Sequence, residues 1–291
     1  MSEQWSPEKI SQGYRHQKHC IDEKTATVIY LAYKLKRPLL IEGPPGVGKT
    51  ELAKILSKLT KSLLVRIQCY EGLDESKALY DWNYHKQLLY LQAYSNDNPW
   101  QDVKDRIYSR EFLLERPLLK AINNTNNQTL LLIDEIDKAD EEFEALLLEL
   151  LGEGSVTIPE YGTIKAKKEP LVFLTSNGSR NLSDPLKRRC LHLYLDYPSP
   201  EQELEILKLK YPELTDELGK QVVSIVSSLR KQDIQKKPSV AESIDWVKAL
   251  QALGVISLSR EVLEVSLALL IKNQSDYIKV HDKLDFFINL L

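Results

Sequence analysis

Short, mostly apolar runs alternate with amphipathic segments through the first two thirds of the chain. The apolar runs have the length of strands that are buried on both faces, and they lie at 38–42, 63–68, 129–134, 171–175 and 191–195. The segments between them repeat apolar residues at helical spacing, and they lie at 25–36, 49–60, 111–122 and 141–151. Within 111–122, Pro117 predicts a break or a helix start. This alternation predicts a doubly wound α/β fold, with a parallel sheet covered by helices on both faces.

Two stretches interrupt the alternation. Segment 70–110 interleaves Tyr and Trp with Asp, Asn, Lys and Gln, and it predicts an insertion of short helices and loops. Its aromatic residues fit either ordinary packing or a partner surface, where Tyr and Trp are favoured anchors. Segment 155–166 alternates around Pro159 and Gly162, which predicts a β-hairpin. The hairpin lysines fit a solvated edge; they are Lys165, Lys167 and Lys168.

The composition changes after Tyr197. Amphipathic helices are predicted for the remainder, at 200–210, 214–229, 239–252, 259–271 and 275–290. We therefore expect an α/β domain over residues 1–197 and a small all-helical domain over residues 198–291.

Composition excludes several classes of protein. Hydrophobic residues make up 43% of the chain and charged residues 28%, which is typical of a soluble globular protein. The net charge of -3 argues against a strong, sequence-independent grip on nucleic acid. No apolar run is long enough to span a membrane, and the N-terminus does not resemble a signal peptide. The cysteines form no CxxC pair and predict buried free thiols in a reducing, cytoplasmic compartment; they are Cys20, Cys69 and Cys190.

Residues 43–50 read GPPGVGKT, directly after a predicted strand and at the start of a predicted helix. This is the pattern and the context of a P-loop, in which glycine backbone and the helix N-terminus cradle the phosphates of a nucleotide. Lys49 is expected to reach the outer phosphates and the Thr50 hydroxyl to ligate Mg²⁺. The expected nucleotide-binding residues are Gly43, Pro44, Pro45, Gly46, Val47, Gly48, Lys49, Thr50 and Glu51, together with Asp134.

The strand predicted at 129–134 ends in the carboxylate of Asp134, and a second carboxylate, Glu135, follows directly. Parallel sheets place ligand sites at the carboxyl ends of their strands, so Asp134 is expected to hold the magnesium shell with Thr50. Glu135 is expected to polarise the attacking water, because phosphoryl transfer depends on alignment and charge. An apolar run before Asp-Glu is a weak signal alone, and it is strong after a P-loop.

The chain resembles AAA+ ATPases, and within them the CoxD-like branch of the MoxR family. GPPGVGKT and LLIDEIDKAD resemble the two nucleotide motifs of that family. RIQCYEGLDESKALYDWNY at 66–84 resembles its CoxD-like branch. The resemblance covers residues 38–197 well and the helical remainder more loosely.

The resemblance implies further site residues. Asn177 stands where such proteins keep a polar sensor of the γ-phosphate, although on sequence alone an Asn before Gly also fits a plain turn. LSDPLKRRC at 182–190 matches the region that supplies an arginine finger. The resemblance assigns the arginine finger to Arg189, with Arg188 as the alternative.

The resemblance also bears on the two ends of the chain. Segment 14–21 is expected near the adenine; a metal site at His16, His19 and Cys20 is a second interpretation. MoxR-like helical lids place an arginine near the nucleotide in a short Ser-Pro-Arg-like run. The matching stretch here, 237–242, reads KPSVAE and has no arginine.

The function implied is ATP hydrolysis that remodels or matures another protein. A homo-oligomeric ring, a hexamer, is expected, with a von Willebrand factor A domain protein and a client metalloenzyme as partners. The alternatives are a nucleic-acid motor, against which the acidic balance speaks, and a non-hydrolysing switch or scaffold, against which the presence of Glu135, Asn177 and Arg189 speaks.

Overall fold

The computed structural model describes residues 5–94 and 99–289. The first four residues, positions 95–98 of the predicted insertion and the last two residues of the predicted lid lie outside this range. The chain divides into two compact units. We call residues 27–42 and 50–194 the sheet unit; the helical unit comprises residues up to 26, the loop 43–49 and residues from 195 onward. The boundary expected between residues 197 and 198 stays a prediction.

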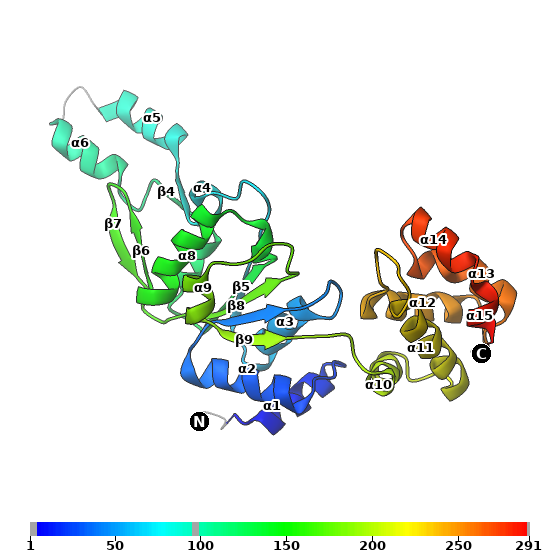
Figure 1. The fold of residues 1–291 in the computed structure, drawn as a ribbon. Helices are drawn as coiled ribbons and strands as arrows, with labels where there is room; N and C mark the ends of the chain where they lie inside the picture. The colour runs from blue at the N-terminus through cyan, green and yellow to red at the C-terminus, as the bar shows by residue number, and fades with distance from the viewer. Residues whose placement is uncertain (1–4, 95–98, 290–291) are drawn as a thin grey trace. The chain divides into compact units, whose positions relative to one another are not determined.

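A five-stranded parallel sheet forms the centre of the sheet unit (Figure 1). The strands run in the order β2-β5-β8-β1-β9. Their bounds are Leu39–Glu42 (β1), Leu63–Gln68 (β2), Thr129–Asp134 (β5), Leu171–Ser176 (β8) and Leu191–Tyr194 (β9). All five agree with the sequence to within one residue at each end. Continuous apolar runs fit strands that are covered on both faces, and β5 and β8 are buried along their whole length. The edge strands β2 and β9 are more exposed.

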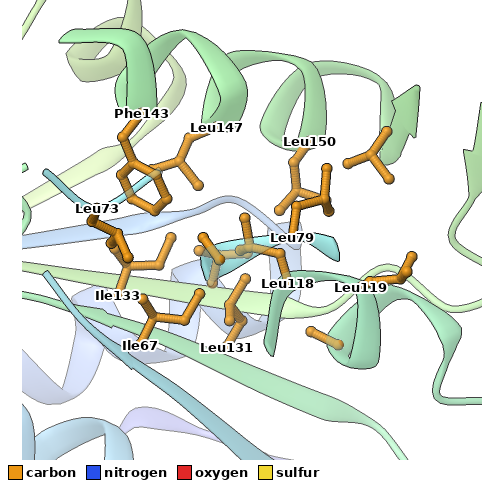
Figure 2. Packing of buried hydrophobic residues seen from close by; sticks show 14 of the residues in the cluster. Ile67, Leu73, Leu79, Leu118, Leu119, Leu131, Ile133, Phe143, Leu147 and Leu150 are labelled. Carbon is orange, nitrogen blue, oxygen red and sulfur yellow. The ribbon is translucent and has the colours of Figure 1, made fainter. Parts of the chain in front are cut away.

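Helices cover both faces of this sheet. Their bounds are Glu23–Leu35 (α2), Lys49–Leu59 (α3), Pro117–Asn123 (α7), Glu141–Glu153 (α8) and Asp184–Arg189 (α9). Figure 2 shows Phe143, Leu147 and Leu150 of α8 pointing at alternate residues of the strands, among them Leu131 and Ile133. Figure 1 shows α2 and α3 on the side of the sheet away from α8. The sequence prediction of a doubly wound α/β fold is therefore confirmed.

The predicted insertion folds as short elements around a small two-stranded sheet. They are α4 (Glu75–Ala78), β3 (Tyr80–Trp82), α5 (Tyr84–Tyr94), α6 (Trp100–Ile107) and β4 (Leu113–Glu115). The predicted hairpin is present as the antiparallel pair β6 (Ser155–Ile158) and β7 (Gly162–Lys165). Lys104 of α6 pairs with Glu160 in the hairpin turn at 3.2 Å, so the insertion and the hairpin are in contact.

The helix predicted over 111–122 is present only from Pro117 onward, so the break predicted at this proline is confirmed and the helix before it is wrong. Residues 113–115 form β4, which pairs with β3 in antiparallel register. The residue before a proline is driven out of the helical region, and Arg116 is extended, with φ -91° and ψ 175°. The helix can start only at Pro117, which occupies its first turn and needs no N–H partner there.

The helical unit holds α1 (Pro7–His16) and the C-terminal helices. The latter are α10 (Pro200–Lys210), α11 (Asp216–Arg230), α12 (Val240–Ala252), α13 (Arg260–Leu270), α14 (Gln274–His281) and α15 (Leu284–Ile288). The helix predicted over 275–290 is thus two helices. The turn at Asp282 and Lys283 separates them, and it lets Val280 and Phe287 enter one core with Trp246.

Cys69 and Cys190 are buried free thiols, as predicted, whereas Cys20 is only half-buried. Burial raises the pKa of the Cys69 and Cys190 thiols to about 12. No helix within residues 5–94 and 99–289 is long and apolar enough to cross a membrane.

Truncation of Leu147 tests the packing of α8 on the sheet. Leu147 is fully buried, so Leu147→Ala is expected to lower the free energy of unfolding by about 2–5 kcal/mol. Leu89→Ala, at a residue of α5 that is 61% exposed, is the matched control and is expected to change it by less than about 0.5 kcal/mol. Urea denaturation measures both. Equal losses in the two variants would contradict this packing.

Candidate nucleotide site

The loop 43–48 joins β1 to α3 in a conformation that two of its glycines permit. Gly46 and Gly48 have φ of +75° and +99°, values that side chains rarely adopt and glycine adopts readily. A methyl group on Gly48 would lie 3.2 Å from Cε1 of His19. The loop therefore passes close to the N-terminal segment 14–21, and its backbone amides lead into the N-terminus of α3, which attracts negative charge.

Lys49 lies along this loop. Its Nζ donates hydrogen bonds to the carbonyl oxygens of Gly43 (2.7 Å) and Pro44 (2.8 Å), and the residue is buried. The ammonium group is thereby held beside the loop backbone, within the helical unit.

Asp134, at the end of β5, is the polar centre of the sheet unit. Its side chain is only 3% exposed. Oδ1 accepts hydrogen bonds from the hydroxyls of Thr50 (2.9 Å) and Thr175 (2.5 Å). Oδ2 accepts from Nε (3.1 Å) and Nη2 (2.6 Å) of Arg66. Each partner comes from a different element, since Thr50 lies on α3, Thr175 on β8 and Arg66 on β2.

Thr50 and Asp134 have the chemistry of a magnesium site. Mg²⁺ prefers oxygen ligands and, in nucleotide sites, takes most of them from phosphates and water, so one or two protein groups suffice. Within the described residues, no cluster of three or more His, Cys, Asp or Glu side chains could hold a metal ion by itself. The alternative metal site at His16, His19 and Cys20 is therefore not supported.

Glu135 follows Asp134 in a strained conformation. Its φ of 57° lies in the left-handed region, which costs a residue other than glycine about 1 kcal/mol or more. Its N–H donates to Oγ1 of Thr175 at 2.9 Å, and this bond helps to hold the turn. The Glu135 carboxylate forms an ion pair with Lys138, and the hydrogen bond to Glu135 raises the pKa of the Lys138 ammonium.

Asp137 anchors the loop after β8. Its carboxylate accepts hydrogen bonds from the N–H of Asn177 (3.2 Å) and from the N–H (3.0 Å) and hydroxyl (2.6 Å) of Ser179. Burial alone would raise the pKa of Asp137, but the Ser179 hydroxyl and the backbone donors together lower it below its ordinary value. Asn177 is thereby fixed at the carboxyl end of β8, the strand next to β5.

Arg188 and Arg189 both lie in the exposed last turn of α9. Nη2 of Arg37 donates to their carbonyl oxygens, at 3.1 and 3.2 Å. The Arg189 guanidinium lies against Gly152 of α8, where an added methyl group would be 3.1 Å from Nη2. For the Arg188 guanidinium, no hydrogen bond or ion pair is recorded to any described residue.

The comparisons with known proteins agree with this geometry. The model of the family described as AAA domain (dynein-related subfamily) matches residues 38–190, more than half of the chain. The chain belongs to this family. AAA+ proteins bind ATP, usually with Mg²⁺, generally hydrolyse it and commonly assemble into oligomeric rings.

The relatives of this AAA domain protein are distant. An uncharacterized protein of Staphylococcus haemolyticus is 22% identical, over 79% of this chain and 81% of its own length. The chaperone protein ClpB of Prochlorococcus marinus is 28% identical, over 77% of this chain and 23% of its own length. The RuvB Holliday junction branch migration motor of Thermotoga maritima aligns at a TM-score of 0.47 and 17% identity, over 93% of this chain and 69% of that chain.

Four residues of the AAA domain belong to the candidate site but were not predicted from the sequence. They are Arg66, Asp137, Lys138 and Thr175. Arg66 carried a signal, because a charged residue inside a strand needs a partner on a neighbouring strand. Asp137 was visible as a third carboxylate in LLLIDEID. Lys138 and Thr175 carried no signal beyond their positions, Lys138 shortly after β5 and Thr175 near the end of β8.

Removal of Arg66 tests the pairing with Asp134. Arg66→Met leaves a buried carboxylate with its two hydroxyl partners but no cation, which is expected to cost about 1–3 kcal/mol of folding free energy. Arg260→Met is the control, because Arg260 pairs with Asp285 at 2.7 Å between two exposed side chains and such pairs contribute little. Urea denaturation at pH 7 compares them; a control as damaging as Arg66→Met would refute the pairing.

Proposed function

We propose that this AAA domain protein is a MoxR-type ATPase of the CoxD-like branch, which hydrolyses ATP to ADP and phosphate. One observation carries the proposal: a P-loop ends in Thr50, whose hydroxyl bonds the first of two carboxylates at the end of β5. In this proposal residues 43–51 and Asp134 bind the nucleotide, and Thr50 and Asp134 hold Mg²⁺. The ion, when bound, neutralises charge on the phosphates.

Glu135 is proposed to orient the attacking water and accept its proton. Its turn places the carboxylate directly after Asp134, and Asn177 follows the neighbouring strand as a donor for the γ-phosphate or the water. Glu135 is paired with Lys138, so this pair has to loosen before the carboxylate can act as a base.

The second part of the proposal is an arginine finger supplied between subunits of a ring, for which a hexamer is the expected size. Arg189 is the proposed finger, with Arg188 as the alternative, and both are exposed on the last turn of α9. The hydrogen bonds from Arg37 to the carbonyl oxygens of both residues support α9 as a fixed mount for either side chain.

The biological role is proposed from the MoxR and CoxD-like resemblance. In it, residues 198–291 are the lid of the nucleotide domain 1–197. The ATPase acts in the cytoplasm as a chaperone for a client metalloenzyme, with a von Willebrand factor A domain protein as its companion. The insertion and the hairpin, joined by Lys104 and Glu160, are the surfaces on which the client contact is proposed. Capture of such a client by an ATP-trapped variant tests this role.

Glu135→Gln tests the proposed base. The amide keeps the shape of the side chain but cannot accept the proton, so turnover is expected to fall about a hundredfold or more, while ATP affinity stays within about threefold. Steady-state phosphate release and calorimetry measure the two quantities. Turnover equal to that of the parent protein would mean that Glu135 is not the catalytic base. If the parent protein itself shows no turnover, the alternative function of a non-hydrolysing nucleotide switch or scaffold is favoured.

Complementation between variants tests the finger. A finger supplied by a neighbouring subunit raises turnover about a thousandfold or more in P-loop enzymes, so Arg188→Ala and Arg189→Ala are expected to bind ATP and only the true finger variant to lose turnover. Lys49→Ala is expected to lose ATP binding yet keep its finger. Mixing Lys49→Ala with the finger variant should restore part of the activity.

Mixed oligomers, detected by native mass spectrometry with differently tagged subunits, are the control for the mixing experiment. A mixture that assembles but stays as inactive as its components means that neither arginine acts across subunits.

A further inference from the structure

Glu144, in the first turn of α8, is a buried carboxylate that has no part in the proposed chemistry. Its side chain is only 2% exposed. A carboxylate is tolerated at such a depth only where donors or cations face its oxygens. The partners of Glu144 therefore show which part of the fold this residue holds in place.

The two recorded partners both come from the segment that joins β8 to α9. Oε1 pairs with Nη2 of Arg180 at 2.5 Å, and Oε2 accepts a hydrogen bond from the backbone N–H of Ser183 at 3.0 Å. Ser183 is the N-cap residue of α9, and within the described residues 183–189 its own hydroxyl accepts no capping bond. Glu144 thus supplies, from α8, the acceptor that fixes the residue at which α9 begins.

Arg180 is itself tied to the backbone between β5 and α8. Its Nε (3.0 Å) and Nη2 (2.5 Å) donate to the carbonyl oxygen of Ala139, and its Nη1 donates to that of Asn181 at 3.2 Å. Ala139 lies four residues after Glu135 and is buried. Because a well-bonded network of this kind is rigid, the guanidinium and the Glu144 carboxylate that pairs with it have defined positions.

The far end of α9 is also fixed. Arg37 donates to the carbonyl oxygens of Arg188 and Arg189 in the last turn, and Leu186 between the two ends is fully buried. The helix has only six residues, and a helix this short depends on such contacts more than on its own hydrogen bonds. A shift at its first residue would therefore move the exposed arginines of its last turn.

The surroundings of Glu144 differ from those of its acidic neighbours. Glu141 and Glu142, in the same turn of α8, are exposed to solvent, which is the ordinary place for an acid at a helix N-terminus. A carboxylate at the depth of Glu144 costs free energy that an apolar side chain would not cost. Packing alone does not account for this residue, whereas the fixed start of α9 does.

We propose that Glu144 is a positioning residue for the arginine finger, because it fixes the start of α9 and with it the place of Arg189, or of Arg188. The inference rests on the proposed finger between subunits and adds the residue that positions it. Glu144 then serves the nucleotide site of the neighbouring subunit and not that of its own. Its loss lowers turnover, since a misplacement of about 1 Å can cost about a hundredfold in rate.

Glu144→Gln tests this role on the full chain. A carboxylate accepts at both oxygens, whereas an amide accepts at one and turns its NH2 group toward either Arg180 or the N–H of Ser183. Turnover is expected to fall about tenfold to a hundredfold, with ATP affinity within about threefold of the parent protein. Glu142→Gln, the matched control at an exposed acid of the same turn, is expected to keep turnover within about twofold.

Mixed oligomers separate this role from damage to the subunit's own site. Glu144→Gln keeps its site and misplaces its finger, so Lys49→Ala subunits, whose finger is intact, are expected to restore part of the activity. The finger variant, Arg189→Ala or Arg188→Ala, is expected to restore none, because neither kind of subunit then presents a working finger. The reverse pattern, rescue by the finger variant and none by Lys49→Ala, overturns the proposal.

The remaining outcomes separate this inference from the proposed function. If Lys49→Ala and the finger variant do not complement each other, the finger between subunits is wrong and the role of Glu144 falls with it. If they do, and Glu144→Gln keeps the turnover of the parent protein, only the role of Glu144 is wrong.

Arg180→Gln is the second variant, for the case that Glu144→Gln does not enter mixed oligomers in native mass spectrometry. It removes the same ion pair from the partner whose side chain is 30% exposed. Arg180→Gln is expected to show the same pattern of rescue, by Lys49→Ala and not by the finger variant. Rescue by the finger variant alone overturns the proposal here as well.

Discussion

The shared carboxylate of Asp134 is the interaction on which the arrangement of the sheet unit depends. It is a buried charge, and a buried charge is tolerated only where partners surround it. Those partners come from α3, β8 and β2, so the same hydrogen bonds that compensate one aspartate also fix the ends of three neighbouring elements. The carboxyl edge of the sheet is rigid because its central acid would be costly in any other arrangement.

The sequence predicted the parts of this edge that follow from pattern alone. The central strands β1, β5 and β8 were visible because they are buried on both faces and read as continuous apolar runs. The phosphate loop was visible because its glycines and lysine stand at fixed spacing. In 111–122 the proline predicted a break or helix start at Pro117, but the apolar spacing did not show that residues 113–115 form a strand and pair with β3.

What the sequence could not supply was the set of partners. Nothing in LLVRIQ says that this strand lies at the edge of the sheet beside β5 and that its arginine bonds Asp134, because strand order is a property of the whole fold. The roles of Lys138 and Thr175 likewise depend on the turn at Glu135, which only the backbone reveals.

The left-handed turn at Glu135 has a consequence for how this protein can change. A glycine would adopt that backbone without strain, so the most stable residue for position 135 is one that has no carboxylate at all. Selection for a sturdier fold and selection for the acid at this point therefore act in opposite directions. Among variants chosen only for resistance to heat, position 135 is where a gain in stability would come at the expense of the chemistry.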